Sequence, residues 1–143
     1  MSEARTGHVL VVDDDEIDTE SLIRSFRKRR IANPIRVARD GLEALAILRG
    51  TGDIEPMSVP YIVLLDLNMP RMNGIEFLEE IRADEELRKS VVFMLTTSDS
   101  DRDILSAYDN QVAGYIVKDR VGDDFLNVIG MLDHYWRVVE LPE

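Results

Sequence analysis

The chain has 143 residues, of which 45% are hydrophobic and 31% charged, so it is long enough for one domain with a substantial core. Its 17 lysines and arginines against 28 aspartates and glutamates give a net charge of −11, which argues against nucleic acid and anionic membranes as direct partners. The absence of cysteine excludes disulfides, thiol catalysis and thiolate metal sites. No apolar run approaches the roughly 18 residues that span a bilayer, and residues 1–7 do not resemble a signal peptide, so we expect a cytoplasmic protein.

Five short segments rich in β-branched and aliphatic residues predict five strands. These segments are residues 8–12, 35–38, 61–66, 91–95 and 113–117. A helical pattern follows each of them, and such alternation predicts a parallel sheet covered on both faces. We therefore expect an α/β fold with a doubly wound five-stranded parallel sheet, five helices, and the strand order 2-1-3-4-5 that sheets of this size most often take.

The helical patterns also predict which side chains face the core. On the first helix these are Ile17, Leu22, Ile23 and Phe26. On the helix after the fourth strand they are Ile104, Leu105 and Tyr108. On the last helix they are Val121, Phe125, Leu126, Ile129, Leu132 and Trp136. Residues 50–60, with two glycines and two prolines, predict a surface loop that is longer than the usual connection.

Distinctive polar side chains follow four of the predicted strands. Asp13 and Asp14 follow the first strand, Asp66 the third, Thr96 the fourth and Lys118 the fifth. The carboxyl ends of parallel strands meet at one edge of the sheet, so we expect these side chains to converge in one crevice. Three neighbouring carboxylates repel one another, and a divalent cation relieves that repulsion. An oxygen-rich set of this kind predicts a Mg²⁺ site.

These groups also suit phosphoryl transfer. A carboxylate oxygen of Asp66 is a competent nucleophile toward an activated phosphoryl group and would form an acyl phosphate. Mg²⁺ and Lys118 would neutralise the phosphoryl oxygens, and Thr96 offers a hydroxyl donor. Taken singly, the aspartates would usually be helix caps and Lys118 a surface side chain. Their position at neighbouring strand ends favours the functional interpretation.

Together these motifs resemble a two-component response regulator receiver domain of the CheY-like type. The resemblance rests on Asp13-Asp14, on Asp66 followed by Leu-Asn-Met-Pro-Arg-Met-Asn-Gly, on Thr96, and on Tyr-Ile-Val directly before Lys118. It implies that Asp66 accepts a phosphoryl group from a histidine kinase and that Lys118 senses it. In this family the protein is a signalling switch and not an enzyme acting on separate substrates.

The resemblance also implies further roles. The implied Mg²⁺ ligands are Asp13, acting more indirectly, Asp14, Asp66 and the backbone carbonyl of Asn68. Thr96 and Tyr115 would form a switch pair that changes a protein-binding surface. The chain would be a single receiver domain over residues 1–143, with a core at about 8–135 and a C-terminal extension at 136–143. It would carry no separate output domain, so its own surface would bind the downstream protein.

A finer resemblance is to the stand-alone receivers that partner phytochrome-type histidine kinases. It rests on the long loop at 50–60, on Leu-Thr-Thr-Ser at 95–98, and on the ending Tyr-Trp-Arg-Val-Val-Glu-Leu-Pro. It implies a phytochrome partner and allows a homodimer. The apolar tail residues Val138, Val139 and Leu141 are either packed back or buried in a partner.

One residue departs from the family pattern. Receivers usually carry proline after the lysine, commonly through a cis peptide, whereas Asp119 follows Lys118 here. A cis bond without proline is less stable by about 2.5–4 kcal/mol, so a trans bond and a different loop are the alternative. Asp119 also adds a negative charge beside the lysine.

Two other function classes remain as alternatives. An aspartate-nucleophile phosphatase would use Asp66 in turnover, but such enzymes need a second acid two residues later, where this chain has Asn68. A flavodoxin-like cofactor protein would need a phosphate loop rich in Gly, Ser and Thr after the first strand. The acidic run at 13–16 would instead repel phosphate.

Overall fold

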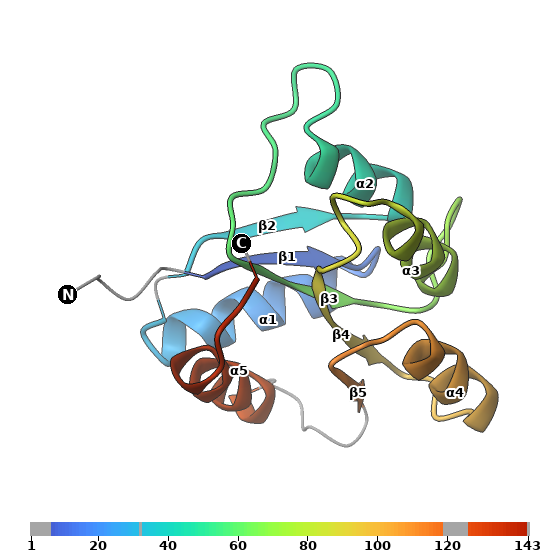
Figure 1. Ribbon diagram of the computed structural model, residues 1–143. Coiled ribbons are helices and arrows are strands. Elements are labelled where there is room, and N and C mark those ends of the chain that lie inside the picture. Colours follow the sequence, from blue (N-terminus) through green and yellow to red (C-terminus); the bar gives the residue numbers. More distant parts are fainter. Residues whose placement is uncertain (1–6, 32, 119–125, 143) are drawn as a thin grey trace.

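Five parallel strands form one central sheet in the computed structural model, which describes residues 7–31, 33–118 and 126–142 (Figure 1). The strands are β1 (His8–Val12), β2 (Ile35–Ala38), β3 (Tyr61–Leu65), β4 (Val91–Thr96) and β5 (Gly114–Val117). Their order is β2-β1-β3-β4-β5, and all four pairings are parallel. The expected α/β fold and strand order are therefore confirmed.

Helices cover both faces of this sheet. The helices are α1 (Glu16–Lys28), α2 (Gly41–Arg49), α3 (Gly74–Ala83), α4 (Asp101–Asp109) and α5 (Leu126–Val138). Figure 1 shows α1 and α5 on one face and α2, α3 and α4 on the other. Side chains alternate along a strand, so Val9 packs under the first pair of helices and Leu10 under the other three. One buried cluster therefore packs on each face of the sheet, and together they fix the strand ends that the polar residues follow.

Local sequence explains where the helices start and stop. Asp15 caps α1 by accepting from the backbone N–H groups of Ile17 and Asp18, at 2.9 Å and 3.2 Å. Asn73 and Glu76 form a reciprocal capping box at the start of α3. Gly50 ends α2 in a left-handed conformation with φ of 68°, which glycine adopts easily because it has no Cβ to clash with the backbone. The loop at 50–60 contains no helix or strand, as expected.

Three side chains expected in the core are exposed. Ile17 is 79% exposed, Leu105 is 64% exposed, and Tyr108 is also on the surface. At 100° of rotation per residue, Ile17 lies about 140° from buried Leu22, and Leu105 lies about 160° from buried Ala107. The apolar spacing therefore predicts the wrong helix face at these positions. Of the last helix, Val121 and Phe125 lie outside the described residues, as do the side chains of Leu126 and Trp136.

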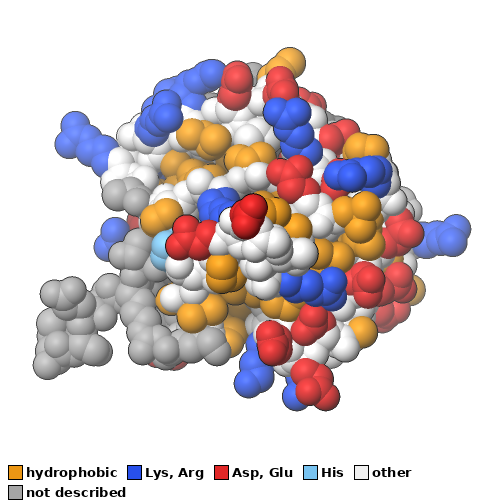
Figure 2. Space-filling model, turned by 90° about the horizontal axis from the view of Figure 1, so that it is seen from above, with side chains coloured by type: hydrophobic (Ala, Val, Ile, Leu, Met, Phe, Trp, Pro, Cys, Tyr) orange, Lys and Arg blue, Asp and Glu red, His pale blue; other side chains and the backbone are white. Residues whose placement is uncertain are grey.

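The C-terminal segment packs back on the sheet in part. Tyr135 contacts Phe93 edge to face, with ring centroids 5.1 Å apart, and Leu141 packs against the cluster under α1 and α5. Val138 and Val139 remain exposed. Among the described residues, no helix is long and apolar enough to cross a membrane. On the face seen in Figure 2, acidic and basic side chains are interspersed and the basic ones form no continuous patch.

Asp40 joins two loops at the carboxyl edge of the sheet. This buried carboxylate caps α2 by accepting from Glu43 N–H at 2.9 Å, and it accepts from Arg71 Nε at 2.7 Å. Burial opposes its ionisation, but these hydrogen bonds outweigh burial and lower the pKa of Asp40. We expect Asp40→Ala to lower the free energy of unfolding by about 3 kcal/mol, measured by urea titration, because the cap and the ion pair are lost together.

Asp53→Ala is the matched control for this change. Asp53 is an exposed acid on the loop at 50–60. Its loss is expected to change the unfolding free energy by less than about 0.5 kcal/mol. Equal effects of the two variants would show that Asp40 does not join the loops energetically.

Candidate functional site

The ends of β1 and β3 bring the predicted acids together. Val12 pairs with Leu65 in the parallel register, and Asp66 N–H donates to Val12 O at 2.9 Å, so Asp13 and Asp66 leave adjacent strands side by side. Together with Asp14 they offer carboxylate oxygens that lie within 4.8 Å of one another. Asp13 and Asp66 are buried, whereas Asp14 is exposed. The convergence expected at this edge is therefore present.

The structure also separates capping aspartates from the others. Asp15 caps α1, and the cap of α3 is Asn73 rather than Asp66. Asp66 Oδ1 instead accepts from the N–H of Leu67 at 2.9 Å. The alternative that Asp66 is a helix cap is therefore excluded.

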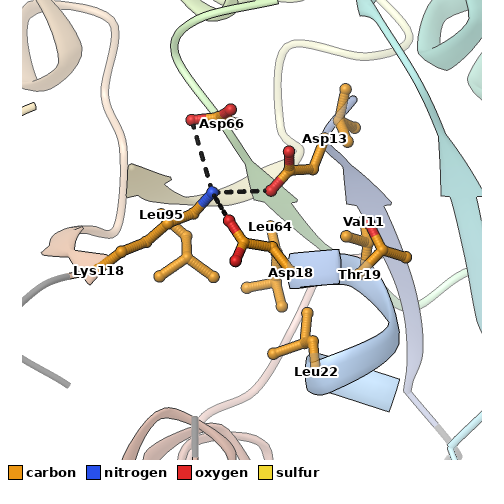
Figure 3. A pocket seen from close by; sticks show the side chains of 10 residues that line it. Val11, Asp13, Asp18, Thr19, Leu22, Leu64, Asp66, Leu95 and Lys118 are labelled. Carbon is orange, nitrogen blue, oxygen red and sulfur yellow. Dashed lines mark hydrogen bonds and ion pairs between the residues drawn. The ribbon is translucent and has the colours of Figure 1, made fainter. Parts of the chain in front are cut away.

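Lys118 lies at the centre of this acidic group (Figure 3). Its Nζ atom lies 2.8 Å from Asp13 Oδ2, 2.8 Å from Asp18 Oδ2 and 3.9 Å from Asp66 Oδ1. The side chain of Lys118 is only 8% exposed. Asp18 was not selected from the sequence, because an acid in the first helical turn normally indicates no more than a favourable helix-dipole interaction. No spacing pattern in the sequence would have pointed to it.

Burial dominates the electrostatics of the site. It raises the pKa of Asp66 to about 6, with a further upward contribution from the charge of Asp13 and opposing ones from Lys118 and Thr96. Burial likewise raises the pKa of Asp13 despite its bond to Lys118. Burial alone would lower the pKa of Lys118, but its hydrogen bonds to Asp13 and Asp18 outweigh burial and raise the pKa. The ionised aspartates are thus only partly compensated, and an added cation would be stabilised.

The predicted switch residues Thr96 and Tyr115 meet at a third residue, Ser98. Thr96 is fully buried at the end of β4, and its Oγ1 accepts from Ser98 N–H at 3.4 Å. The Tyr115 hydroxyl donates to Ser98 O at 2.8 Å. Ser98 Oγ donates to Asp103 at the start of α4, at 2.6 Å. The sequence indicated only a turn at Ser98, because its contacts with Thr96 and Tyr115 run through backbone groups that any residue would supply.

The donor set fits a hard divalent cation. Mg²⁺ and similar ions take carboxylate and carbonyl oxygens, and three suitable carboxylates lie together here. Asn68 is exposed two residues after Asp66, and the role of its carbonyl remains a prediction. Asp119 lies outside the described residues, and so does the geometry of the Lys118-Asp119 bond.

A wider hollow of about 450 Å³ lies at the opposite end of the sheet, beside the starts of β4 and β5. Arg82 lines it, and its guanidinium donates to backbone carbonyls. The accepting carbonyls belong to Arg88, Ser90, Asn110 and Gln111. Arg82 therefore joins chain segments, and the acidic edge remains the candidate site.

Comparison with known proteins identifies the family. The family profile of the response regulator receiver domain matches residues 9–129. The chain belongs to the response regulator receiver domain family. Response regulator Rcp1 of Synechocystis sp. is 32% identical over 135 residues, which cover 94% of this chain and 92% of that protein. The crystal structure of its Mn²⁺-bound form matches with a TM-score of 0.84 and 31% identity, covering 96% of this chain and 99% of that one.

Two further solved structures are similar. The phosphorylated cyanobacterial phytochrome response regulator RcpA matches with a TM-score of 0.87 and 30% identity, covering 97% of this chain and 100% of that one. A response regulator in red light signalling of R. palustris, RPA3017, matches with a TM-score of 0.83 and 34% identity, covering 96% and 99%.

The family assignment confirms the functional class. This chain contains a receiver domain, related to phytochrome response regulators, that acts as a phosphorylation switch in two-component signalling. A receiver domain implies a histidine kinase as its partner and binds a divalent metal. The phosphatase alternative is not favoured.

Proposed function

We propose that Asp66 accepts the phosphoryl group from a histidine kinase and that Mg²⁺ is the metal at this site. The proposal rests on one observation: buried Asp66 lies beside buried Asp13 and exposed Asp14, with carboxylate oxygens close enough to share one divalent ion, and Lys118 Nζ lies 3.9 Å from Asp66 Oδ1. The implied Mg²⁺ ligands remain Asp13, Asp14, Asp66 and the backbone carbonyl of Asn68. Bound Mg²⁺ would supply charge neutralisation to the phosphoryl oxygens.

The hydrogen bonding of the two Asp66 carboxylate oxygens indicates which of them attacks in phosphoryl transfer. Oδ1 is engaged by the N–H of Leu67, which leaves Oδ2 as the attacking oxygen. A new bond forms between this oxygen and phosphorus while the P–N bond of the kinase phosphohistidine breaks, and its electron pair stays on the imidazole. A pKa of about 6 leaves Asp66 largely ionised at neutral pH and therefore nucleophilic. Lys118 would then move toward the new negative charge.

We propose that Ser98 links the switch pair. Thr96 would donate to the phosphoryl group, and the N–H of Ser98 that now donates to Thr96 would follow it. That displacement would strain or release the Tyr115 hydroxyl bond to Ser98 O. The surface formed by α4, β5 and α5 would change as a result.

The partner proposals are more specific than the family. Similarity to RcpA and RPA3017 supports a phytochrome-type histidine kinase in the cytoplasm. The downstream protein is unspecified, and neither nucleic acid nor membrane is a proposed partner. The exposed Val138 and Val139 support a homodimer, which sizing of the full chain against a chain lacking residues 137–143 would test. The domain limits proposed from the sequence, 8–135 with an extension at 136–143, are retained.

Phosphotransfer profiling tests the function directly. The chain is incubated with Mg²⁺ and with each of several phosphorylated histidine kinases, including a phytochrome kinase. We expect transfer from the phytochrome kinase to be at least about 100-fold faster than from unrelated kinases. Equal rates from all kinases would contradict the phytochrome partner. Absence of transfer from every kinase and from acetyl phosphate would contradict the phosphoacceptor role.

A further inference from the structure

Lys118 is held by an acidic side chain that no strand end supplies. Its Nζ atom donates to Asp13 and Asp18, each at 2.8 Å, while Asp66 lies at 3.9 Å, beyond hydrogen-bond distance. In the view of Figure 3, Asp66 and Asp18 lie on opposite sides of this nitrogen. The bond to Asp18 thus lies on the side of the ammonium away from the proposed phosphoacceptor.

Among the described residues, the hydrogen bond and ion pair of the Asp18 carboxylate go to Lys118. The start of α1 does not depend on it, because Asp15 is the cap and Asp18 contributes only its backbone N–H there. The Asp18 side chain is 30% exposed and Lys118 is 8% exposed, so water screens this pair less than a surface pair. Among the described residues, the pairing with Lys118 is the attractive interaction of this carboxylate, beside its charge repulsion from Asp13.

The place of the ammonium matters once Asp66 carries a phosphoryl group. That group bears close to two negative charges, and Lys118 must approach it for the two to pair. The approach lengthens the contact with Asp18, so the pairing of Lys118 with Asp18 opposes its pairing with the phosphoryl group.

We propose that Asp18 is a positioning residue that retains Lys118 in the unphosphorylated arrangement and so weakens the affinity of the site for a phosphoryl group. The inference rests on the proposed role of Asp66. Asp18 thereby sets how readily the switch turns on, although it touches neither the phosphoryl group nor the attacking oxygen.

Beryllofluoride, a phosphoryl mimic, tests this without a kinase. The full chain with Mg²⁺ is titrated while the amide NMR signals of Leu67 and Thr96 are followed. Asp18→Asn is expected to lower the half-saturating concentration about fivefold, the size expected for loss of one partly shielded ion pair. Asp18→Ser removes the same charge and is expected to lower the half-saturating concentration by a similar factor. Asp18→Glu keeps the charge and is expected to have a half-saturating concentration near that of the wild type.

Glu16→Gln is the matched control. Glu16 lies in the same helical turn but pairs with the exposed Arg39, so its loss is expected to change the half-saturating concentration less than about twofold. A second control adds Asp18→Asn to Lys118→Met, where no further change is expected because the effect runs through the ammonium. Melting temperatures confirm that each variant is folded.

Several results would overturn the inference. These are unchanged or weaker binding in Asp18→Asn and Asp18→Ser, an equal gain in Glu16→Gln, or a gain that persists without the lysine. Failure of the proposed function has a different signature. In that case the wild type itself shows no saturable shift at Leu67, or Asp66→Asn shows the same shift as the wild type.

Discussion

Asp66→Asn is expected to abolish phosphoryl uptake and, at the same time, to stabilise the metal-free protein at neutral pH. The amide lacks the anionic oxygen that attacks phosphorus, so label from acetyl phosphate should stay at background. The stability gain follows from burial, which raises the pKa of Asp66 from 3.8 to about 6. A buried carboxylate that must ionise destabilises the folded state.

The sign of the pH dependence is specific. Above about pH 6 the carboxylate is ionised in both the folded and unfolded chain, and only the folded chain bears the full burial penalty. Between pH 6 and pH 4 the folded chain takes up the proton first, so the wild type gains stability relative to the variant as pH falls. Asp66→Asn should therefore be more stable by about 3 kcal/mol near pH 7.5, with the difference vanishing near pH 4.

Urea titration in the presence of a chelator, repeated across this pH range, measures the difference. Asp53→Asn, on the exposed loop at 50–60, is the control for loss of one negative charge. A stability difference that does not change with pH, or an Asp66→Asn variant that is less stable at pH 7.5, would contradict the buried-carboxylate account.

Gly74→Ala is expected to disable the site through backbone contact alone. A Cβ at Gly74 would lie 2.5 Å from the carbonyl oxygen of Asp66 and 3.0 Å from Cα of Leu67. Both atoms belong to the main chain, and Gly74 N–H already donates to Leu67 O at 2.8 Å, so neither can move without displacing Asp66. We expect a loss of about 2–3 kcal/mol in unfolding free energy and about 100-fold slower phosphorylation.

Gly52→Ala separates this contact from backbone strain. Gly52 has φ of 67° and nothing within 4 Å of an added Cβ, so alanine there is strained but meets no neighbour. A loss of about 1 kcal/mol and an unchanged phosphorylation rate are expected. If Gly74→Ala takes up phosphate from acetyl phosphate as fast as Gly52→Ala does, the close approach of α3 to Asp66 has no functional role.

The local pattern of apolar residues was sufficient to predict most of the fold. The apolar runs at 8–12 and 61–66 predicted buried strands, and strand–helix alternation predicted a parallel sheet. The order 2-1-3-4-5 was expected because it is the most frequent one for sheets of this size, and the structure confirms it. Because parallel strand ends meet at one edge, the same pattern was sufficient to bring Asp13, Asp66 and Lys118 together. The convergence of these residues follows from the sheet topology and does not depend on how their side chains are oriented.

Helix faces were predicted less well, because a short amphipathic pattern leaves the inward direction uncertain. Ile17 and Leu105 are hydrophobic at roughly helical spacing, yet packing turned α1 toward Leu22 and Phe26 and α4 toward Ala107. The neighbouring layers, rather than the helix itself, decide which stripe is buried.

By itself, the sequence determined the α/β fold, the acidic strand ends and the family, since these depend on residue order and on the rule that parallel strands share an edge. Only the tertiary structure decided that Asp15 is the cap, that Ser98 lies between Thr96 and Tyr115, and that Asp18 holds Lys118. Asp18 and Lys118 are 100 positions apart, and no local pattern encodes a contact over that separation. The contact forms because folding places the start of α1 beside the end of β5, within the length of the two side chains.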